Sequence, residues 1–264
     1  MNLALTGSTG RLGGAIASQL VDLDPLLLVR DPSRAPAGRT ATSSYDDPGD
    51  LAGIRTLFMV SGAEDADRVG QHRTFVEAAA AAGVEHLVYT SFFGAAPDAT
   101  FTLVRDHWAT EELIKTSGMS WTFLRNQLYA DVLPLFAATG EIRGPAGDGR
   151  FAPVTIADLA DVASSVLRAP QQHRGRTYSL TGPETLSMSE VAAQLTAAGK
   201  PTAFVNETVE EAYASRAHYG EPDWQVEAWV STYLAVADGS LDHVTDDVAT
   251  LLRRQPTSFA QMLG

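Results

Sequence analysis

The chain has 264 residues, 45% of them hydrophobic and 19% charged, a balance typical of a globular protein with a sizeable core. Its 32 acidic and 19 basic residues give a formal charge of −13, which argues against nucleic acid or a membrane surface as a partner. Cysteine is absent and the six histidines are scattered, so we expect no disulfide, no cysteine nucleophile and no metal site. No apolar run has the roughly 20 residues of a membrane span. The first residues indicate a buried strand rather than a secretion signal, so we expect a cytoplasmic protein.

The first half of the chain alternates short apolar runs with helical patterns. The apolar runs predict strands at 2–5, 26–29, 56–60, 86–89 and 121–124. Apolar residues at helical spacing predict helices over about 12–20, 65–82 and 106–116. The segment 34–44, rich in alanine, proline, glycine, threonine and serine, indicates a loop. The alternation predicts an α/β fold, a doubly wound parallel sheet with helices on both faces.

The second half indicates a small, mostly helical lobe. The stretches 187–190 and 208–211 both match the capping box, in which a hydroxyl accepts from a first-turn amide and a glutamate reaches back. We expect the helices that they begin to end near 199 and 220. Two further helices are predicted over 223–237 and 245–254.

The strongest local signal is the sequence TGSTGRLG at 6–13, between the first strand and the first helix. Its glycines permit positive φ and a close approach of the backbone to a pyrophosphate. The helix N-terminus would present free N–H groups and a partial positive charge to the phosphates. We therefore predict a nucleotide-binding turn, with a ligand-free glycine-rich turn as the alternative. The predicted contacts are Gly7, Ser8, Thr9, Gly10, Arg11, Leu12 and Gly13.

The end of the second strand indicates which nucleotide is bound. Proteins that bind NAD usually carry Asp or Glu there, to hold the ribose 2′-hydroxyl. This chain has Arg30 in that place, and Arg34 follows one turn later. A guanidinium can bind a 2′-phosphate through two hydrogen bonds, which favours NADP(H) over NAD(H). The alternative is that Arg30 pairs with Asp31 or with another surface carboxylate.

With these motifs, the sequence resembles the NmrA-like atypical short-chain dehydrogenases, in particular their quinone oxidoreductase type 2 and triphenylmethane reductase branch. The resemblance covers nearly the whole chain. Besides the glycine-rich turn, it is carried by VRDPSR at 29–34, QHRTFVEAAAAAGVEHLVYTS at 71–91 and HWATEELIKTSGMSWTFLRN at 107–126.

The resemblance implies a Rossmann-like, NADP-binding domain over 1–125. It also implies a mainly substrate-binding lobe over 126–264, some segments of which return to the first domain. The nicotinamide would lie near the carboxyl ends of the strands, with Arg73 or its neighbour His72 also near the cofactor. The residues implied at that end are Ser61, Gly62, Thr90, Ser91, His107 and the strand end at 124–126. Asn126 to Tyr129 would line the pocket, and a homodimer is plausible within this family.

One departure from ordinary short-chain dehydrogenases bears on the chemistry. Those enzymes use a Tyr and, four residues later, a Lys, to deliver a proton. Alignment on Glu111 puts Leu103 and His107 at these positions, so the pair is absent. His107, with a pKa near neutrality, would donate a hydrogen bond or proton to a developing phenolate; alternatively it holds the ribose or is a plain helix-face histidine.

Other side chains near the predicted strand ends are candidates for the substrate pocket. Asn126 would bond the substrate oxygen or the nicotinamide carboxamide, unless it is a structural asparagine. A flat aromatic wall would come from Phe92, Phe93, Trp108 and Tyr129, unless these rings belong to the core.

The sequence therefore predicts an NADPH-dependent reductase that transfers hydride to a quinone or a similar planar, electron-poor compound. A non-catalytic NADP(H)-sensing regulator and a tailoring enzyme acting on an aromatic natural product are the alternatives.

Overall fold

The computed structural model describes residues 2–264, and the chain divides into two compact units. The first runs from the N-terminus to Phe92 and includes Asp106–Arg125 and Ile156–Ser179. The second comprises Phe93–Arg105, Asn126–Thr155 and Leu180–Gly264. The division predicted after residue 125 coincides with one of the points where the chain passes between units. Among the described residues, no helix combines the length and the apolar character needed to cross a membrane.

The first unit is built on a seven-stranded sheet in the order β3-β2-β1-β4-β5-β6-β9. The strands are β1 (Leu3–Thr6), β2 (Leu26–Val29), β3 (Arg39–Thr42), β4 (Thr56–Met59), β5 (His86–Phe92), β6 (Ser120–Asn126) and β9 (Arg176–Leu180). β1 pairs in parallel with β2 and β4, β2 with β3, and β4 with β5. The strand order reverses between β1 and β4, and nucleotides bind at that reversal in doubly wound folds. The predicted fold class is confirmed.

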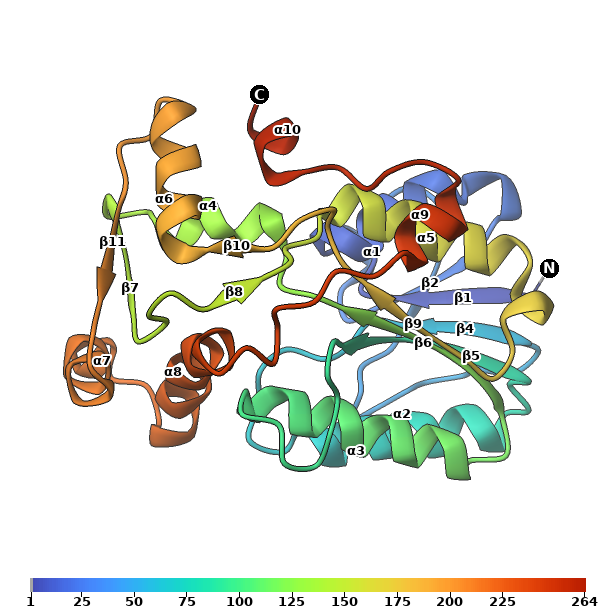
Figure 1. Ribbon diagram of the computed structural model, residues 1–264. Helices are drawn as coiled ribbons and strands as arrows, with labels where there is room; N and C mark the ends of the chain where they lie inside the picture. The colour runs from blue at the N-terminus through green and yellow to red at the C-terminus, as the bar shows by residue number, and fades with distance from the viewer. Residues whose placement is uncertain (1) are drawn as a thin grey trace. The chain divides into compact units, whose positions relative to one another are not determined.

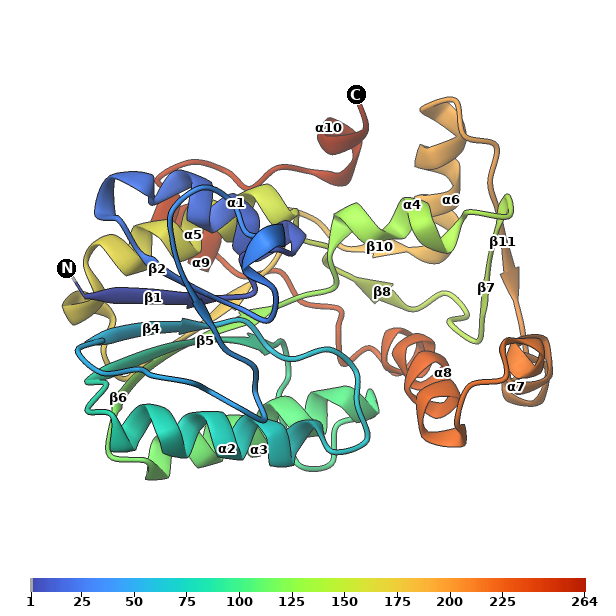
Figure 2. The ribbon, with the colours of Figure 1, turned by 180° about the vertical axis from the view of Figure 1, so that it is seen from behind.

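Helices cover both faces of this sheet (Figures 1 and 2). α1 (Arg11–Gln19) and α5 (Ile156–Arg168) pack together on one face, and α2 (Arg68–Ala81) and α3 (Thr102–Thr116) lie on the other. β1 and β4 are buried along their whole length, because central strands between two helical layers have no exposed side. One apolar cluster joins the strands to α2, with Phe75 and Phe123 fully buried in it.

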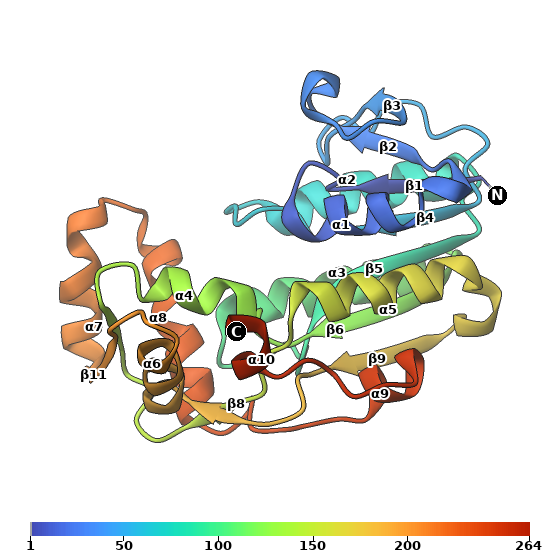
Figure 3. The ribbon, with the colours of Figure 1, turned by 90° about the horizontal axis from the view of Figure 1, so that it is seen from above.

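One missed strand and two shifted helix starts in the first unit differ from the prediction. The segment expected to be a loop contains β3, which pairs with β2 from Leu26↔Arg39 to Val29↔Thr42 and lies at the sheet edge (Figure 3). β3 is largely exposed, so it has no apolar pattern, and only its pairing with β2 makes it a strand. α2 begins three residues later than expected and α3 four residues earlier.

The second unit contains most of the remaining helices and two small sheets. Its helices are α4 (Leu133–Phe136), α6 (Met188–Ala197), α7 (Val209–Arg216), α8 (Asp223–Ala237), α9 (Asp247–Leu252) and α10 (Phe259–Leu263). The sheets pair β7 (Glu141–Gly144) with β11 (Ala203–Asn206), and β8 (Arg150–Phe151) with β10 (Leu186–Ser187). Both predicted capping boxes are formed, at the starts of α6 and α7. The sheets were not predicted, because β8 and β10 have only two residues each and β7 and β11 are partly exposed, without a continuous apolar run.

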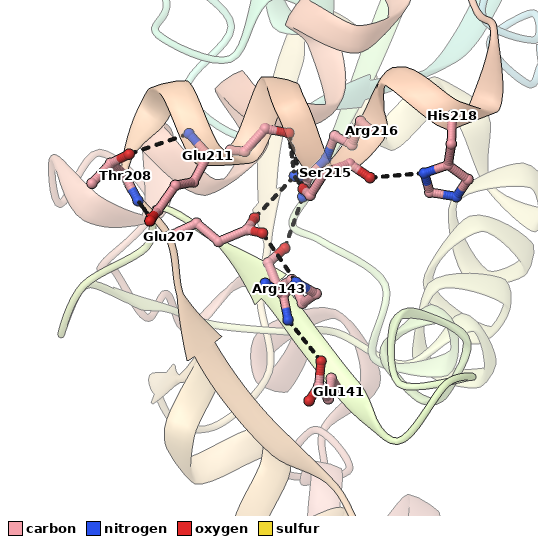
Figure 4. Close-up of polar contacts among 9 residues, drawn as sticks. Glu141, Arg143, Glu207, Thr208, Glu211, Ser215, Arg216 and His218 are labelled. Carbon is pink, nitrogen blue, oxygen red and sulfur yellow. Dashed lines mark hydrogen bonds and ion pairs between the residues drawn. The ribbon is translucent and has the colours of Figure 1, made fainter.

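A buried carboxylate connects three elements of the second unit (Figure 4). Glu207 is 4% exposed and lies between the end of β11 and the start of α7. It accepts from Arg143 Nε at 3.0 Å and from Arg216 Nη1 at 3.2 Å. Arg216 also donates to the Arg143 carbonyl oxygen at 2.7 Å. Burial alone would raise the pKa of Glu207, but hydrogen bonds from Arg216, Ser215 and Arg143 outweigh it and lower the pKa.

We expect Glu207→Gln to lower the free energy of unfolding by about 3 kcal/mol, because it leaves the mostly buried Arg216 guanidinium without a counter-charge. Glu141→Gln is the matched control, since Glu141 bonds the same Arg143 at the surface and should contribute under ~1 kcal/mol. The lowered pKa of Glu207 makes its contribution largest above the ordinary carboxyl pKa and lost as the pH falls through the folded value. Urea denaturation near neutral and at acidic pH measures both effects. Equal losses for the two variants would contradict this role of Glu207.

Candidate functional site

The predicted turn between β1 and α1 has the geometry of a phosphate-binding loop. Gly7 has φ = 69°, and its carbonyl accepts from the Gly10 N–H at 2.9 Å. A Cβ at Gly13 would stand 2.2 Å from the Gly7 carbonyl oxygen, so only glycine lets α1 approach the turn this closely. α1 begins at Arg11 without a side-chain cap, and the first amides of a helix have no partner within the helix.

The residues of this turn fit a bound pyrophosphate. Ser8 is 1% exposed, and its hydroxyl oxygen has no hydrogen-bond partner among residues 2–264. Buried hydroxyls are rarely left unpaired, so a polar ligand would satisfy this one. Thr9 and Arg11 are exposed beside it, while Leu12 is buried and so would contribute only its backbone.

Arg30 follows β2 directly and is exposed. The alternative pairing with Asp31 is not formed. The Asp31 carboxylate instead accepts from the Ser33 amide at 2.9 Å and from the Ser33 hydroxyl at 2.7 Å. No ion pair joins Arg30 to any other described residue, so its guanidinium is available to a ligand. Arg34 ends the short 3₁₀ turn Pro32–Arg34 on the same connection and is exposed as well.

The structure brings together several of the residues predicted beside the nicotinamide. The Ser61 amide donates to Thr90 Oγ1 at 2.7 Å, and the Gly62 amide donates to His72 Nε2 at 2.9 Å. These contacts join the segment after β4 to β5 and α2. Of the two neighbours on α2, it is therefore His72 that contacts this segment. Arg73 is exposed and lies in a groove between α2 and α3 with Leu113 and Thr116.

His107 is 7% exposed, and both of its ring nitrogens are bonded inside the first unit. Its Nε2 must accept from Arg68 Nη2 at 3.2 Å, since a guanidinium only donates. Its Nδ1 therefore carries the proton and donates to the Tyr89 hydroxyl at 3.0 Å. Burial, followed by the Arg68 charge, holds the pKa of His107 well below 6.5. The expected pKa near neutrality is wrong, and His107 is a neutral, fully bonded side chain.

Arg68, at the start of α2, is a residue that sequence reasoning missed. It is 5% exposed, its Nε has no partner in the described chain, and Asp106 is 3.7 Å from its Nη1. Its charge contributes to the low pKa values of both His72 and His107. No motif marks it, because an arginine in a first helical turn is ordinarily a solvated surface residue.

Ser91 and Glu111 form a second buried contact at the end of β5. The Ser91 hydroxyl donates to Glu111 Oε1 at 2.6 Å. Glu111 is completely buried and also accepts from Arg125 Nε at 2.8 Å and Nη2 at 2.6 Å. The pair Glu111-Glu112 looks like a solvated helix end in the sequence, but only Glu112 is near the surface. Because the Ser91 hydroxyl donates its proton to Glu111, it can only accept a hydrogen bond from a ligand.

The predicted aromatic and amide residues are divided between the two units, and contacts join some of them within each unit. In the first unit, the ring centroids of Phe92 and His107 are 6.1 Å apart, and Trp108 is partly buried. In the second, the Phe93 amide donates to the Asn126 carbonyl at 2.9 Å, and Asn126 Nδ2 donates to the Tyr129 hydroxyl at 3.2 Å. Asn126 is 2% exposed, and its Oδ1 has no partner among residues 2–264.

Comparison with known proteins gives the family. Residues 7–170 match the family described as NAD(P)H-binding, a range that contains the glycine-rich turn, Arg30 and His107. The chain belongs to this NAD(P)H-binding family. It is also 30% identical to quinone oxidoreductase 2 of Escherichia coli over 99% of this chain and 97% of that protein. It is 31% identical to the NAD(P)H azoreductase of Xenophilus azovorans, over 98% and 96% of the two chains.

A solved structure agrees with these relatives. The triphenylmethane reductase of a Citrobacter species, complexed with NADP(H), superposes with a TM-score of 0.86 at 29% identity, over 99% of this chain and 98% of that one. The resemblance inferred from the motifs is therefore confirmed. This member of the NAD(P)H-binding family is an NAD(P)H-dependent oxidoreductase with a Rossmann-like fold.

Proposed function

We propose that this protein is an NADPH-dependent reductase that transfers hydride to a quinone or a similar planar, electron-poor aromatic compound. The observation that carries the proposal is the state of His107, which stands where ordinary short-chain dehydrogenases have their lysine. It is buried, neutral and bonded at both ring nitrogens. With Leu103 in the place of the tyrosine, neither position supplies an acid.

A reductase without a dedicated acid suits acceptors whose reduced form is a stable anion. The chemistry supplied by a reduced nicotinamide is hydride transfer. A quinone that takes up the hydride becomes a hydroquinone monoanion, which gains its proton from water without an acid in the transition state. Quinones, azo dyes and triphenylmethane dyes share low-lying acceptor orbitals on a conjugated aromatic frame, and a cationic triphenylmethane dye becomes neutral when it takes up a hydride, so it needs no proton. Relatives named for these three substrates support the same class here.

The preference for NADPH rests on the unpaired guanidinium of Arg30 at the end of β2, beside the glycine-rich turn. A bidentate guanidinium contact matches a 2′-phosphate and has no comparable partner in NAD(H). The glycine-rich turn and the α1 N-terminus would hold the pyrophosphate. Asn126, with its free Oδ1, would accept a hydrogen bond from the nicotinamide carboxamide or from the substrate. The aromatic side chains that would contact the substrate are Phe92 and Trp108 in the first unit and Phe93 and Tyr129 in the second.

Steady-state oxidation of NADPH tests the proposal, with benzoquinones and naphthoquinones, an azo dye and a simple ketone as acceptors. We expect turnover with the quinones, no turnover with the ketone and a preference for NADPH over NADH. Reactions without enzyme are needed, because quinones oxidise NADPH slowly by themselves. Tight NADPH binding with no turnover of any acceptor would contradict the proposal and favour an NADP(H)-sensing protein. Turnover confined to larger aromatic natural products would favour a tailoring enzyme.

A further inference from the structure

The segment Val60–Gly62, which follows β4, is held by side chains at three consecutive amides. β4 ends at Met59, which pairs with Tyr89 of β5, so the segment lies beyond the last paired residue of the strand. Each amide donates to a side chain on a different element. The acceptors are Thr6 Oγ1 for Val60 at 2.8 Å, Thr90 Oγ1 for Ser61 at 2.7 Å, and His72 Nε2 for Gly62 at 2.9 Å. The segment is therefore anchored to β1, β5 and α2 at the carboxyl edge of the sheet.

His72 is the part of this anchor that depends on a protonation state. Because the Gly62 amide donates to Nε2, Nδ1 carries the proton and donates to Thr110 Oγ1 at 2.8 Å. Thr110 gives its own proton to the Asp106 carbonyl at 2.8 Å, which fixes the direction of the chain of bonds. His72 is completely buried, and burial with the nearby Arg68 charge lowers its pKa to about 3. It is thus a neutral acceptor at physiological pH.

The side chains of His72 and Tyr45 pack tightly around Gly62. A Cβ on Gly62 would stand 3.0 Å from His72 Nε2 and 3.3 Å from the Tyr45 ring. The rings of Tyr45 and His72 meet edge to face at 5.3 Å, and the Tyr45 hydroxyl donates to the Val60 carbonyl.

We propose that His72 is a positioning residue for the cofactor, which acts through the Gly62 amide to hold the segment after β4 in its binding position. All three amides are engaged inside the first unit. The backbone can therefore offer a ligand only its remaining carbonyl oxygens. Such acceptors match the hydroxyls of a ribose and would repel a phosphate. The proposal rests on the proposed function only in its use of NADPH.

Binding of NADPH without any acceptor tests this role, followed by fluorescence titration. We expect His72→Leu to weaken NADPH binding about tenfold, because it leaves the Gly62 amide without its acceptor. His72→Gln, whose side-chain oxygen can accept near the position of Nε2, should recover most of the affinity. The matched control is His86→Leu. His86 is also fully buried and bonds Thr122 Oγ1 at 2.8 Å, but it starts β5, six residues before the carboxyl end of that strand.

The outcomes separate a positioning role from a structural one. His86→Leu should lower the melting temperature as much as His72→Leu does, yet leave the NADPH dissociation constant unchanged. In the wild type, ¹⁵N spectra should show His72 as the Nδ1–H tautomer, without titration between about pH 5 and 8. Equal affinities of His72→Leu and wild type, or a His72 that titrates in this range, would overturn the proposal. A wild type that does not bind NADPH would instead contradict the proposed function.

Discussion

Gly13→Ala should abolish measurable NADPH binding, with a loss of affinity of about 100-fold or more. The added Cβ would stand 2.2 Å from the Gly7 carbonyl oxygen, so α1 must move away from the turn. The first-turn amides would then leave the place where they meet the pyrophosphate. Losing one or two hydrogen bonds to a charged group, at about 1.5–3 kcal/mol each, gives a loss of this size. Isothermal titration calorimetry with NADPH measures it.

Gly14→Ala is the matched control for this substitution, because it adds the same methyl group one residue further along α1. Its Cβ would stand 3.1 Å from the Ser8 carbonyl oxygen, a contact that a small shift relieves. We expect its NADPH affinity to stay within about fivefold of wild type, and circular dichroism should show both variants folded. Full affinity in a folded Gly13→Ala protein would show that the pyrophosphate is not bound at this turn.

Arg30→Glu should reverse the cofactor preference. Its guanidinium has no ion-pair partner among the described residues, so the substitution breaks no ion pair of the fold. It removes a bidentate partner of the 2′-phosphate and puts a like charge in its place. We expect kcat/KM for NADPH to fall about 100-fold or more, while the value for NADH stays within about threefold or rises. The carboxylate can accept from the ribose 2′-hydroxyl of NADH, as in NAD-binding relatives of this fold.

Arg39→Glu controls for the change in overall charge. Arg39 is also exposed and lies on β3, next to β2, but it pairs with Asp24 at 3.8 Å. We expect this variant to lower the NADPH value only slightly, in a salt-dependent way. Equal losses for NADPH and NADH in Arg30→Glu would show that Arg30 does not bind the 2′-phosphate.

These variants address the part of the site that local sequence specifies best. Gly7, Gly10 and Gly13 lie three residues apart in the chain, and this spacing encodes a turn whose geometry depends on few distant contacts. The position of Arg30 at the end of β2 could be predicted for the same reason, since Arg30 directly follows an apolar strand. The capping boxes at 187–190 and 208–211 are local as well, and both were predicted correctly.

The pKa values and hydrogen-bond partners of His107 and His72 could not be predicted from the local sequence. The pKa of a histidine depends on its burial and on neighbours that come from other elements. His107 bonds Arg68, 39 residues away, and Tyr89, 18 residues away, and no local pattern links these positions. The same holds for Glu111, whose burial depends on Arg125 from the next strand. β3 also has no apolar signal of its own and exists only because β2 is beside it.

The doubly wound architecture, the glycine-rich turn, the arginine after β2 and the absence of the tyrosine–lysine pair could all be predicted from the sequence. Each of these features depends on residues close together in the chain, through the backbone conformations open to glycine, the spacing of apolar residues and the charge of single side chains. The charge state of the buried groups and the position of each proton on them depend instead on the folded structure. It gave Ser61 and Gly62 their anchors on Thr90 and His72, and it left both ring nitrogens of His107 hydrogen-bonded and the pKa of His107 lowered. Hydrogen-bond direction and desolvation are set by groups that meet only when the chain is folded.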